Sequence, residues 1–228
     1  MLAKLLHTKL TVLALCWIGV IFAGQTQASC IVSKATIEET ALSPYQLIDT
    51  ATKKVLAEIK RHRAELDTST EEAVRQQQFA CFVGEVDRIL GQIVDFDWIA
   101  LKVMGSDGKV ASAEQKAEFA ETFRAGLVET YGRGLLNYSS ERIVLLPTED
   151  IEDKRKVTVH QQIVGVEATY PLDYTMGLKD GQWKVINVII NGINLGKTFR
   201  GQFAQSSQKN KGDIDKVIAS WDSGITNG

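Results

Sequence analysis

The sequence predicts an α+β fold, with a mostly antiparallel four-stranded sheet wrapped by N- and C-terminal helices. Two observations carry this prediction. Apolar residues recur at helical spacing up to about residue 138, and from Ser140 onward they alternate with polar residues as in strands. Asp180-Gly181 then forms a two-residue turn of the kind favoured in β-hairpins. Helices followed by a separate run of strands are typical of the α+β class.

Four helices are expected before the sheet. Ser43-Pro44 places an N-cap before a proline at the first helical position, and Ser112-Ala113-Glu114-Gln115 has the form of a capping box. Ser69 or Thr70 starts the second helix and Asp95 starts the third. The expected helices cover approximately residues 44–63, 70–94, 95–104 and 113–138.

The hairpin turn also sets an expected register for the last two strands. Four expected pairs share one strongly apolar side of the sheet: Leu178 with Trp183, Met176 with Val185, Tyr174 with Asn187, and Leu172 with Ile189. The strands are expected at residues 141–146, 155–165, 170–178 and 182–190. A short helix over 195–203, a polar loop over 206–212 and a last helix over 213–221 complete the chain.

The first 28 residues have the layout of a secretory signal. Lys4 and Lys9 precede the apolar run Leu10–Phe22, and small and polar residues follow up to Ala28. The run is shorter than the roughly 20 residues that span a bilayer. We therefore expect a cleaved signal peptide over residues 1–28 and a single exported domain over 29–228. That domain has 24 basic and 28 acidic residues, which does not suit nucleic-acid binding.

Two cysteines remain once Cys16 is removed with the signal. Cys81 lies on the side of its helix away from the apolar stripe, beside Gln77 and Arg88. An oxidising compartment would allow a Cys30–Cys81 disulfide. The alternative is that Cys30 is lipidated, because small residues precede it as in a lipoprotein signal.

Motif searches predict no catalytic residue, no metal site and no cofactor. The sequence lacks G-x-S-x-G, H-E-x-x-H, P-loop and G-x-G-x-x-G patterns. His160 is expected to be a surface strand residue, and His62 is expected to place positive charge at a basic helix end. Neither histidine has a local carboxylate partner in the sequence. Asp173 is the only strand acid to nominate for an isomerase-like pocket, and it falls on the mixed face of the sheet.

Several segments together resemble the MlaC family of toluene-tolerance proteins. The run Trp183–Leu195 followed by Phe199-Arg200-Gly201-Gln202-Phe203 is similar to the C-terminal pattern of that family. Phe119–Tyr138 resembles its F-x-x-x-F…T-Y helix, and Asp95-Phe96-Asp97 resembles its D-F-E helix start. The resemblance spans residues 43–221. The chain departs from the pattern at residues 105–109, which replace an aromatic-bearing segment, and at Phe199, which replaces a tyrosine.

This resemblance implies a periplasmic phospholipid-binding carrier of the Mla pathway, which maintains outer-membrane lipid asymmetry. The implied partners are phospholipid, an inner-membrane ABC transporter complex with a substrate-binding MCE-type subunit, and an outer-membrane lipoprotein–porin complex. Two alternatives remain open from the sequence: a small-molecule enzyme of the cone-shaped α+β type, and a lipidated envelope interaction protein.

A lipid carrier of this kind needs an apolar cavity inside the sheet and helices. One expected wall comes from the strands and the other from the fourth helix, and Arg200 is expected at the headgroup or the mouth. The expected lipid-binding residues are Leu127, Tyr131, Val157, Val159, Ile163, Tyr174, Met176, Val185 and Ile189. The same residues also suit a filled core, and the sequence does not separate the two cases.

Overall fold

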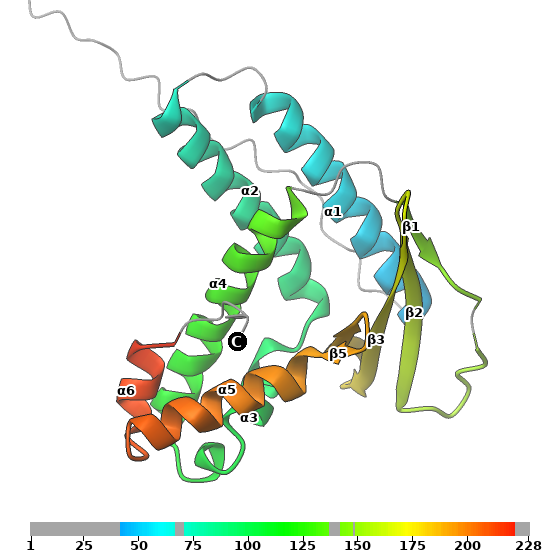
Figure 1. The fold of residues 1–228 in the computed structure, drawn as a ribbon. Coiled ribbons are helices and arrows are strands. Elements are labelled where there is room, and N and C mark those ends of the chain that lie inside the picture. Colours follow the sequence, from blue (N-terminus) through cyan, green and yellow to red (C-terminus); the bar gives the residue numbers. More distant parts are fainter. Residues whose placement is uncertain (1–41, 67–70, 137–141, 148, 222–228) are drawn as a thin grey trace, which may run out of the picture.

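A computed structural model describes residues 42–66, 71–136, 142–147 and 149–221 of the chain (Figure 1). These residues confirm the α+β class and the order of helices, sheet and helices. The helices are α1 Pro44–Leu66, α2 Glu72–Ile93, α3 Phe96–Met104, α4 Ala113–Leu135, α5 Leu195–Lys209 and α6 Ile214–Ala219, with a 3-10 turn, η1, at Asp107–Lys109. The strands are β1 Arg142–Leu145, β2 Lys156–Val164, β3 Thr169–Lys179, β4 Gln182–Ile190 and β5 Ile193–Asn194. Within the described part, no helix is both long and apolar enough to cross a membrane.

The local signals for helix starts are largely confirmed. Ser112 and Gln115 form both hydrogen bonds of the expected capping box at the start of α4. The N-cap of α2 is Glu71, so the expected start at Ser69 or Thr70 is wrong by one or two residues. Both of those residues, the expected helix end at Tyr138 and the whole signal segment lie outside the described residues.

The strands form one antiparallel sheet in the order β1-β2-β3-β4-β5. The fifth strand was not predicted. Asn191 and Gly192 have φ values of 48° and 80°, close to the 50° and 80° of Asp180-Gly181, so both pairs make the same kind of two-residue hairpin turn. The second turn folds β5 back onto β4 and directs the chain into α5.

The expected hairpin register is correct near the turn and wrong beyond it. Met176 pairs with Val185 as expected. The register then shifts, so that Thr175 pairs with Asn187 and Tyr174 pairs with Val188. Ile186 is the extra residue of a β-bulge, which reverses the alternation of faces in the rest of β4. Ile189 therefore pairs with Asp173 on the other face, where we had expected it opposite Leu172.

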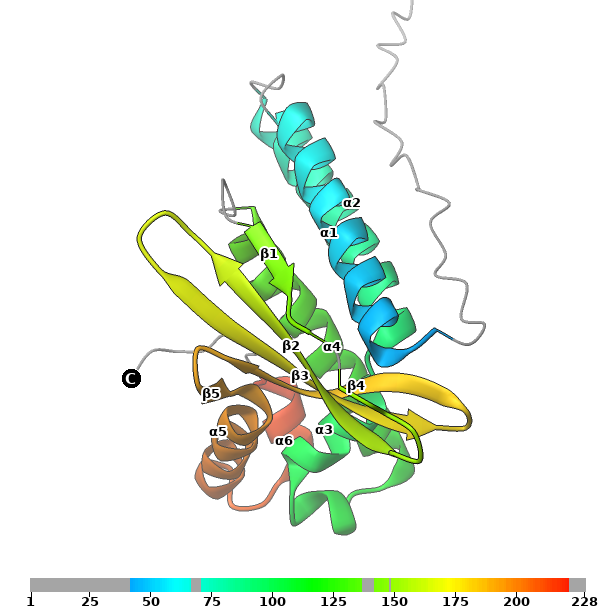
Figure 2. The same cartoon turned by 90° about the vertical axis from the view of Figure 1, so that its right-hand side faces the viewer.

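Helices cover the sheet in two groups that lie at different ends of it. The α1–α2 pair lies at one end, and α3, α5 and α6 lie at the other, with α4 running between them (Figures 1 and 2). Helix α4 packs on α2, α3 and α6. Helix α5 is longer than expected, because residues 206–209 continue the helix where a polar loop was predicted. Ser207 is buried there, and Asn210 closes the helix by donating from its side chain to the Ser206 carbonyl.

The packed interior divides into three separate clusters. The first joins α1 and α2 to the sheet and includes Ile48, Ile89 and Met176. The second is an aromatic cluster of α3, α4, α5 and α6, in which Phe203 and Trp221 contact Phe119 edge-on. The third lies between α1, α2 and α4 and includes Phe96 at the start of α3.

Asp95 joins three elements at the centre of the fold. Its backbone N–H donates to the Val185 carbonyl of β4 at 3.0 Å, and its Oδ1 accepts from the Trp98 N–H in the first turn of α3 at 3.1 Å. Its Oδ2 accepts from Lys179 Nζ at the end of β3 at 2.8 Å, and this hydrogen bond raises the pKa of Lys179. The Asp95 side chain is only 8% exposed, so these charge-assisted bonds replace its contact with water.

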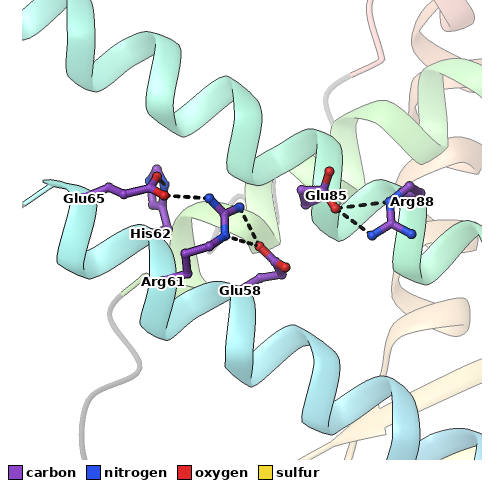
Figure 3. A network of polar contacts seen from close by, with 6 residues as sticks. All are labelled: Glu58, Arg61, His62, Glu65, Glu85 and Arg88. Atoms are coloured by element: carbon purple, nitrogen blue, oxygen red, sulfur yellow. Dashed lines mark hydrogen bonds and ion pairs between the residues drawn. The ribbon is translucent and has the colours of Figure 1, made fainter. Parts of the chain in front are cut away.

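The expectation that His62 adds positive charge to a helix end is wrong. Its side chain is 1% exposed, and its ring stacks on Phe82 of α2 with 4.9 Å between centroids. Burial lowers the pKa of His62, so the neutral ring is favoured. Figure 3 shows that Arg61 provides the charge instead, in ion pairs with Glu58 at 2.6 Å and Glu65 at 2.7 Å.

We predict that His62 makes the fold sensitive to mild acid. The unfolded chain takes up a proton at this residue near pH 6.5, whereas the folded chain does so only at lower pH. Stability from this group is complete above about pH 6.5 and is lost as the pH falls towards the lowered folded pKa, by at most about 1.4 kcal/mol per pH unit. Glu65 and Glu58 oppose the shift, and burial and Arg61 favour it.

Urea unfolding of the wild type and His62→Phe between pH 7.5 and pH 5 measures this contribution. The variant keeps a ring against Phe82 and removes both the titrating group and the unpaired Nε2. Its stability should depend less steeply on pH than that of the wild type. Equal slopes would contradict the prediction.

Candidate functional site

An apolar cavity of about 180 Å³ lies where the three clusters of the interior meet. The sheet and helices α2, α3, α4 and α5 all contribute to its wall, and none of the described residues that line it is charged. The lining residues are Leu90, Ile93, Val94, Phe96, Ile99, Phe123, Leu127, Val128, Tyr131, Tyr174, Val185, Asn187, Val188, Leu195, Gly196 and Phe199.

Helical and strand periodicities place the opposing walls. Phe123, Leu127 and Tyr131 are spaced four apart and therefore lie along one side of α4. On the sheet side, Tyr174 and Val188 form a cross-strand pair beyond the bulge. The chain leaving α2 closes the space between them, because Val94 bridges Val185 of β4.

Two tyrosines are the main polar groups of the wall. Burial raises the pKa of Tyr131 to about 12, and burial also raises the pKa of Tyr174. Both hydroxyls therefore remain protonated at neutral pH. Within the described part of the chain, the buried hydroxyl of Tyr131 has no hydrogen-bond partner. It can donate to an acceptor that enters the cavity, such as an ester carbonyl.

The structure brings together four of the nine residues expected to bind lipid. Leu127, Tyr131, Tyr174 and Val185 line the cavity. The other five lie outside its lining. Val157, Val159 and Met176 are buried against α1 and α2 in the first cluster, and the remaining two are Ile163, which pairs with Tyr170, and Ile189, on the far face. Lipid contact by these nine residues stays a prediction.

Residues of α2, α3 and α5 also contribute to the wall, and these were not predicted. Leu90, Ile93 and Val94 come from the end of α2, and Leu195 and Phe199 come from the first turns of α5. Their apolar stripes were visible in the sequence. The missing information was that three helix ends converge on one point, which periodicity alone does not show.

Asn187 and Gly196 separate the cavity from a second, more polar hollow. The Gly196 N–H at the start of α5 donates to Asn187 Oδ1 on β4 at 3.1 Å. Both residues line both spaces, as does Ile99. Arg200, expected at the headgroup or mouth, is exposed and lines the second hollow.

The acid and histidine considered for catalysis lie away from the cavity. His160 Nδ1 is 2.7 Å from Asp173 Oδ1 across β2 and β3, so the expectation that His160 lacks a carboxylate partner fails in three dimensions. Asp173 alternates with Tyr174 and therefore lies on the opposite face of the sheet. No cluster of three or more ligand-type residues that could hold a metal occurs within the described ranges.

Cys81 is disulfide-bonded, and its partner lies outside the described residues. Its side chain is half-buried on α2, away from the cavity lining. The choice of Cys30 as the partner therefore stays a prediction.

An α+β domain whose sheet and helices enclose an uncharged apolar cavity is suited to binding an apolar ligand. The family model described as MlaC protein matches residues 49–223. This chain belongs to the MlaC family.

Known proteins extend this likeness over most of the chain. The toluene tolerance protein ttg2D of Pseudomonas putida is 34% identical over 183 residues, covering 79% of this chain and 80% of that protein. The intermembrane phospholipid transport system binding protein MlaC of Haemophilus influenzae is 25% identical over 170 residues, covering 72% and 74%. A phospholipid-binding protein from Ralstonia solanacearum, solved in complex with a phospholipid, shares the fold with a TM-score of 0.66 at 24% identity, covering 78% and 94%.

We predict that a methyl group at Gly196 disrupts the boundary between the apolar cavity and the second hollow. A Cβ there would stand 2.7 Å from Asn187 Oδ1, so Gly196→Ala must displace the Asn187 side chain and lose its hydrogen bond. The expected loss of stability is about 1 kcal/mol in urea unfolding. Gly201→Ala on the same helix is the control, because its added Cβ would contact no other described part of the structure beyond its own helix turn. That control should be neutral or slightly stabilising, and equal effects of the two changes would contradict the prediction.

Proposed function

We propose that this chain is a periplasmic phospholipid carrier that holds acyl chains in the cavity between α4 and the sheet. The observation that carries the proposal is the lining itself, which comes from four helices and two strands and includes no charged side chain among the described residues. The phospholipid bound by the Ralstonia solanacearum protein of the same fold supports it, as do the names of the two relatives.

The physical reason for a protein carrier is the cost of exposing acyl chains to water. Burial of one methylene is worth about 0.8 kcal/mol, so two chains with about 30 methylenes gain roughly 24 kcal/mol. Release into water is then negligible. A bilayer offers a similar gain, so transfer to a docked membrane complex is near balance.

The cavity must widen to hold a whole lipid. Its volume of about 180 Å³ is below the roughly 300–1,000 Å³ of typical ligand sites. We place the widening between α4 and the sheet, because these two walls face each other across the cavity, whereas Met176 and its neighbours pack directly against α1 and α2.

The family resemblance supports the wider setting of this proposal. In it, residues 1–28 direct export, and residues 29–228 act as a single domain that shuttles lipid between an outer-membrane lipoprotein–porin complex and an inner-membrane ABC transporter with an MCE-type subunit. In this setting the chain acts by binding and transfer, without covalent chemistry on its cargo.

The expected outcome of purification from a bacterial host without detergent is phospholipid bound at up to one molecule per chain. Native mass spectrometry measures it. Leu127→Trp should lower the lipid content strongly and leave the melting temperature nearly unchanged, because the new ring fills cavity space. Thr130→Trp, on the exposed side of the same helix, is the matched control and should keep its lipid.

Met176→Trp separates a cavity from a filled core. Met176 is fully buried in the first cluster, so a larger side chain there should cost about 1–3 kcal/mol of stability. If Leu127→Trp lost as much stability as Met176→Trp and kept its lipid, Leu127 would belong to a core and the proposed site would be wrong. Apo protein alone, found repeatedly in lysates rich in membrane, would contradict the carrier function.

We also propose Cys30 as the partner of Cys81, since removal of the signal would leave no other cysteine. Alkylation of the native protein without reductant should then label neither residue, and reduction in denaturant should expose both. Mass spectrometry of the mature N-terminus tests the alternative directly. Full labelling of Cys81 before reduction, or a lipid on Cys30, would refute the pairing.

A further inference from the structure

The second hollow is strongly basic. It has a volume of about 260 Å³ and lies between α3, α5 and the sheet. Four exposed cationic side chains from three elements line it: Lys102 of α3, Lys156 of β2, and Lys197 and Arg200 of α5. Among the residues that the structure describes, no carboxylate is part of the lining.

These four cations lack acidic partners within the described part of the chain, whereas several arginines elsewhere form ion pairs with carboxylates. Arg124 binds Asp87 at 2.6 Å, and Arg61 is held by two glutamates. A cluster of like charges without counter-charges creates a positive potential that attracts anions. Gly105 leaves space for one member of the cluster, because a Cβ there would stand 3.2 Å from Arg200 Nε.

The start of α5 adds to this potential. Gly196 and Lys197 in its first turn line the hollow, and the helix continues for 15 residues. The N-terminal end of such a helix carries a partial positive charge. Trp98 is 38% exposed on the same lining, with Lys102 Nζ at 5.1 Å from its ring centroid. An aromatic ring beside cations is suited to the boundary between acyl chains and headgroups.

The hollow also adjoins the apolar cavity. Ile99, Asn187 and Gly196 belong to both linings, and the last two are joined by a hydrogen bond at the boundary. A lipid with its acyl chains in the cavity can therefore reach the hollow with its phosphate.

We propose that this basic hollow binds the phosphate of the lipid headgroup and makes the carrier select anionic phospholipids over zwitterionic ones. The inference rests on the proposed carrier function and adds the class of cargo. Phosphatidylglycerol brings its phosphate without a cation. Phosphatidylethanolamine brings an ammonium group into a space already lined by four cations, and repulsion between like charges opposes its binding.

The test is loading from equimolar vesicles of phosphatidylglycerol and phosphatidylethanolamine with identical acyl chains. The full-length mature protein is incubated, separated from the vesicles and extracted, and mass spectrometry gives both lipids per chain. Wild type should enrich phosphatidylglycerol about fivefold. The variant with Lys102, Lys156, Lys197 and Arg200 all changed to Gln should lose the enrichment and keep its total lipid.

A control variant changes four other lysines to Gln, so that the net charge falls by the same amount. Lys60, Lys116, Lys209 and Lys211 lie outside the lining of the hollow. This variant should keep the wild-type enrichment. Inorganic phosphate, titrated into lipid-loaded protein and followed by NMR, should produce no saturable shift at millimolar concentrations, because the headgroup already occupies the site.

Each remaining outcome overturns the inference. Lipid taken up without preference, or equal loss of preference in both quadruple variants, would leave the carrier function standing and refute the headgroup site. Saturable binding of inorganic phosphate without any change in lipid preference would make the hollow a site for free phosphate. A lower affinity for anionic vesicles with an unchanged ratio of bound lipids would make it a membrane-docking surface. A wild-type protein that takes up no lipid at all would refute the carrier function itself.

Discussion

The buried carboxylate of Asp95 is the interaction on which the arrangement of the fold depends. This one residue caps α3, hydrogen-bonds to β4 and forms an ion pair with Lys179 at the end of β3, directly after the C-cap of α2. Helices and sheet are thereby held at a common point, although they pack in different clusters. Loss of the carboxylate would leave the Trp98 N–H unpaired at a partly buried position, which is more costly than the loss of an exposed ion pair.

Around Asp95, the helices pack against different parts of the fold and cannot all cover the apolar face of the sheet. Helices α1 and α2 cover the Met176 end of the apolar sheet face closely, while α4 is held by α2, α3 and α6. Because α4 packs on those three helices, it does not also close onto Tyr174 and Val188, and the space between becomes the cavity. The cavity thus forms where the three clusters adjoin but do not pack tightly against one another. It is apolar because the residues at the edges of these clusters line it.

The sequence was sufficient for the class of fold, most element bounds, the capping box and the family. It was insufficient for the division between cavity and core. Tyr174 and Met176 are two apart on one strand face, and alternation assigns them the same role, yet one lines the cavity and the other is buried against α1 and α2. Periodicity shows which face is apolar but does not show what lies opposite. His62 was misplaced for a related reason, since charge near a helix end does not reveal that Phe82 covers the ring.

The bulge at Ile186 constrains how the length of β4 can vary. Val185 before the bulge and Val188 after it line the same cavity. In a regular strand, two residues three positions apart would point to opposite faces. Deletion of Ile186 would restore regular alternation and leave both halves of the strand facing as they do now. Deletion of a residue between the bulge and the Asn191-Gly192 turn would instead turn the side chains that follow it to the opposite face of the sheet. Among single-residue deletions within this strand, the bulge is therefore the position at which both halves of the cavity wall are preserved.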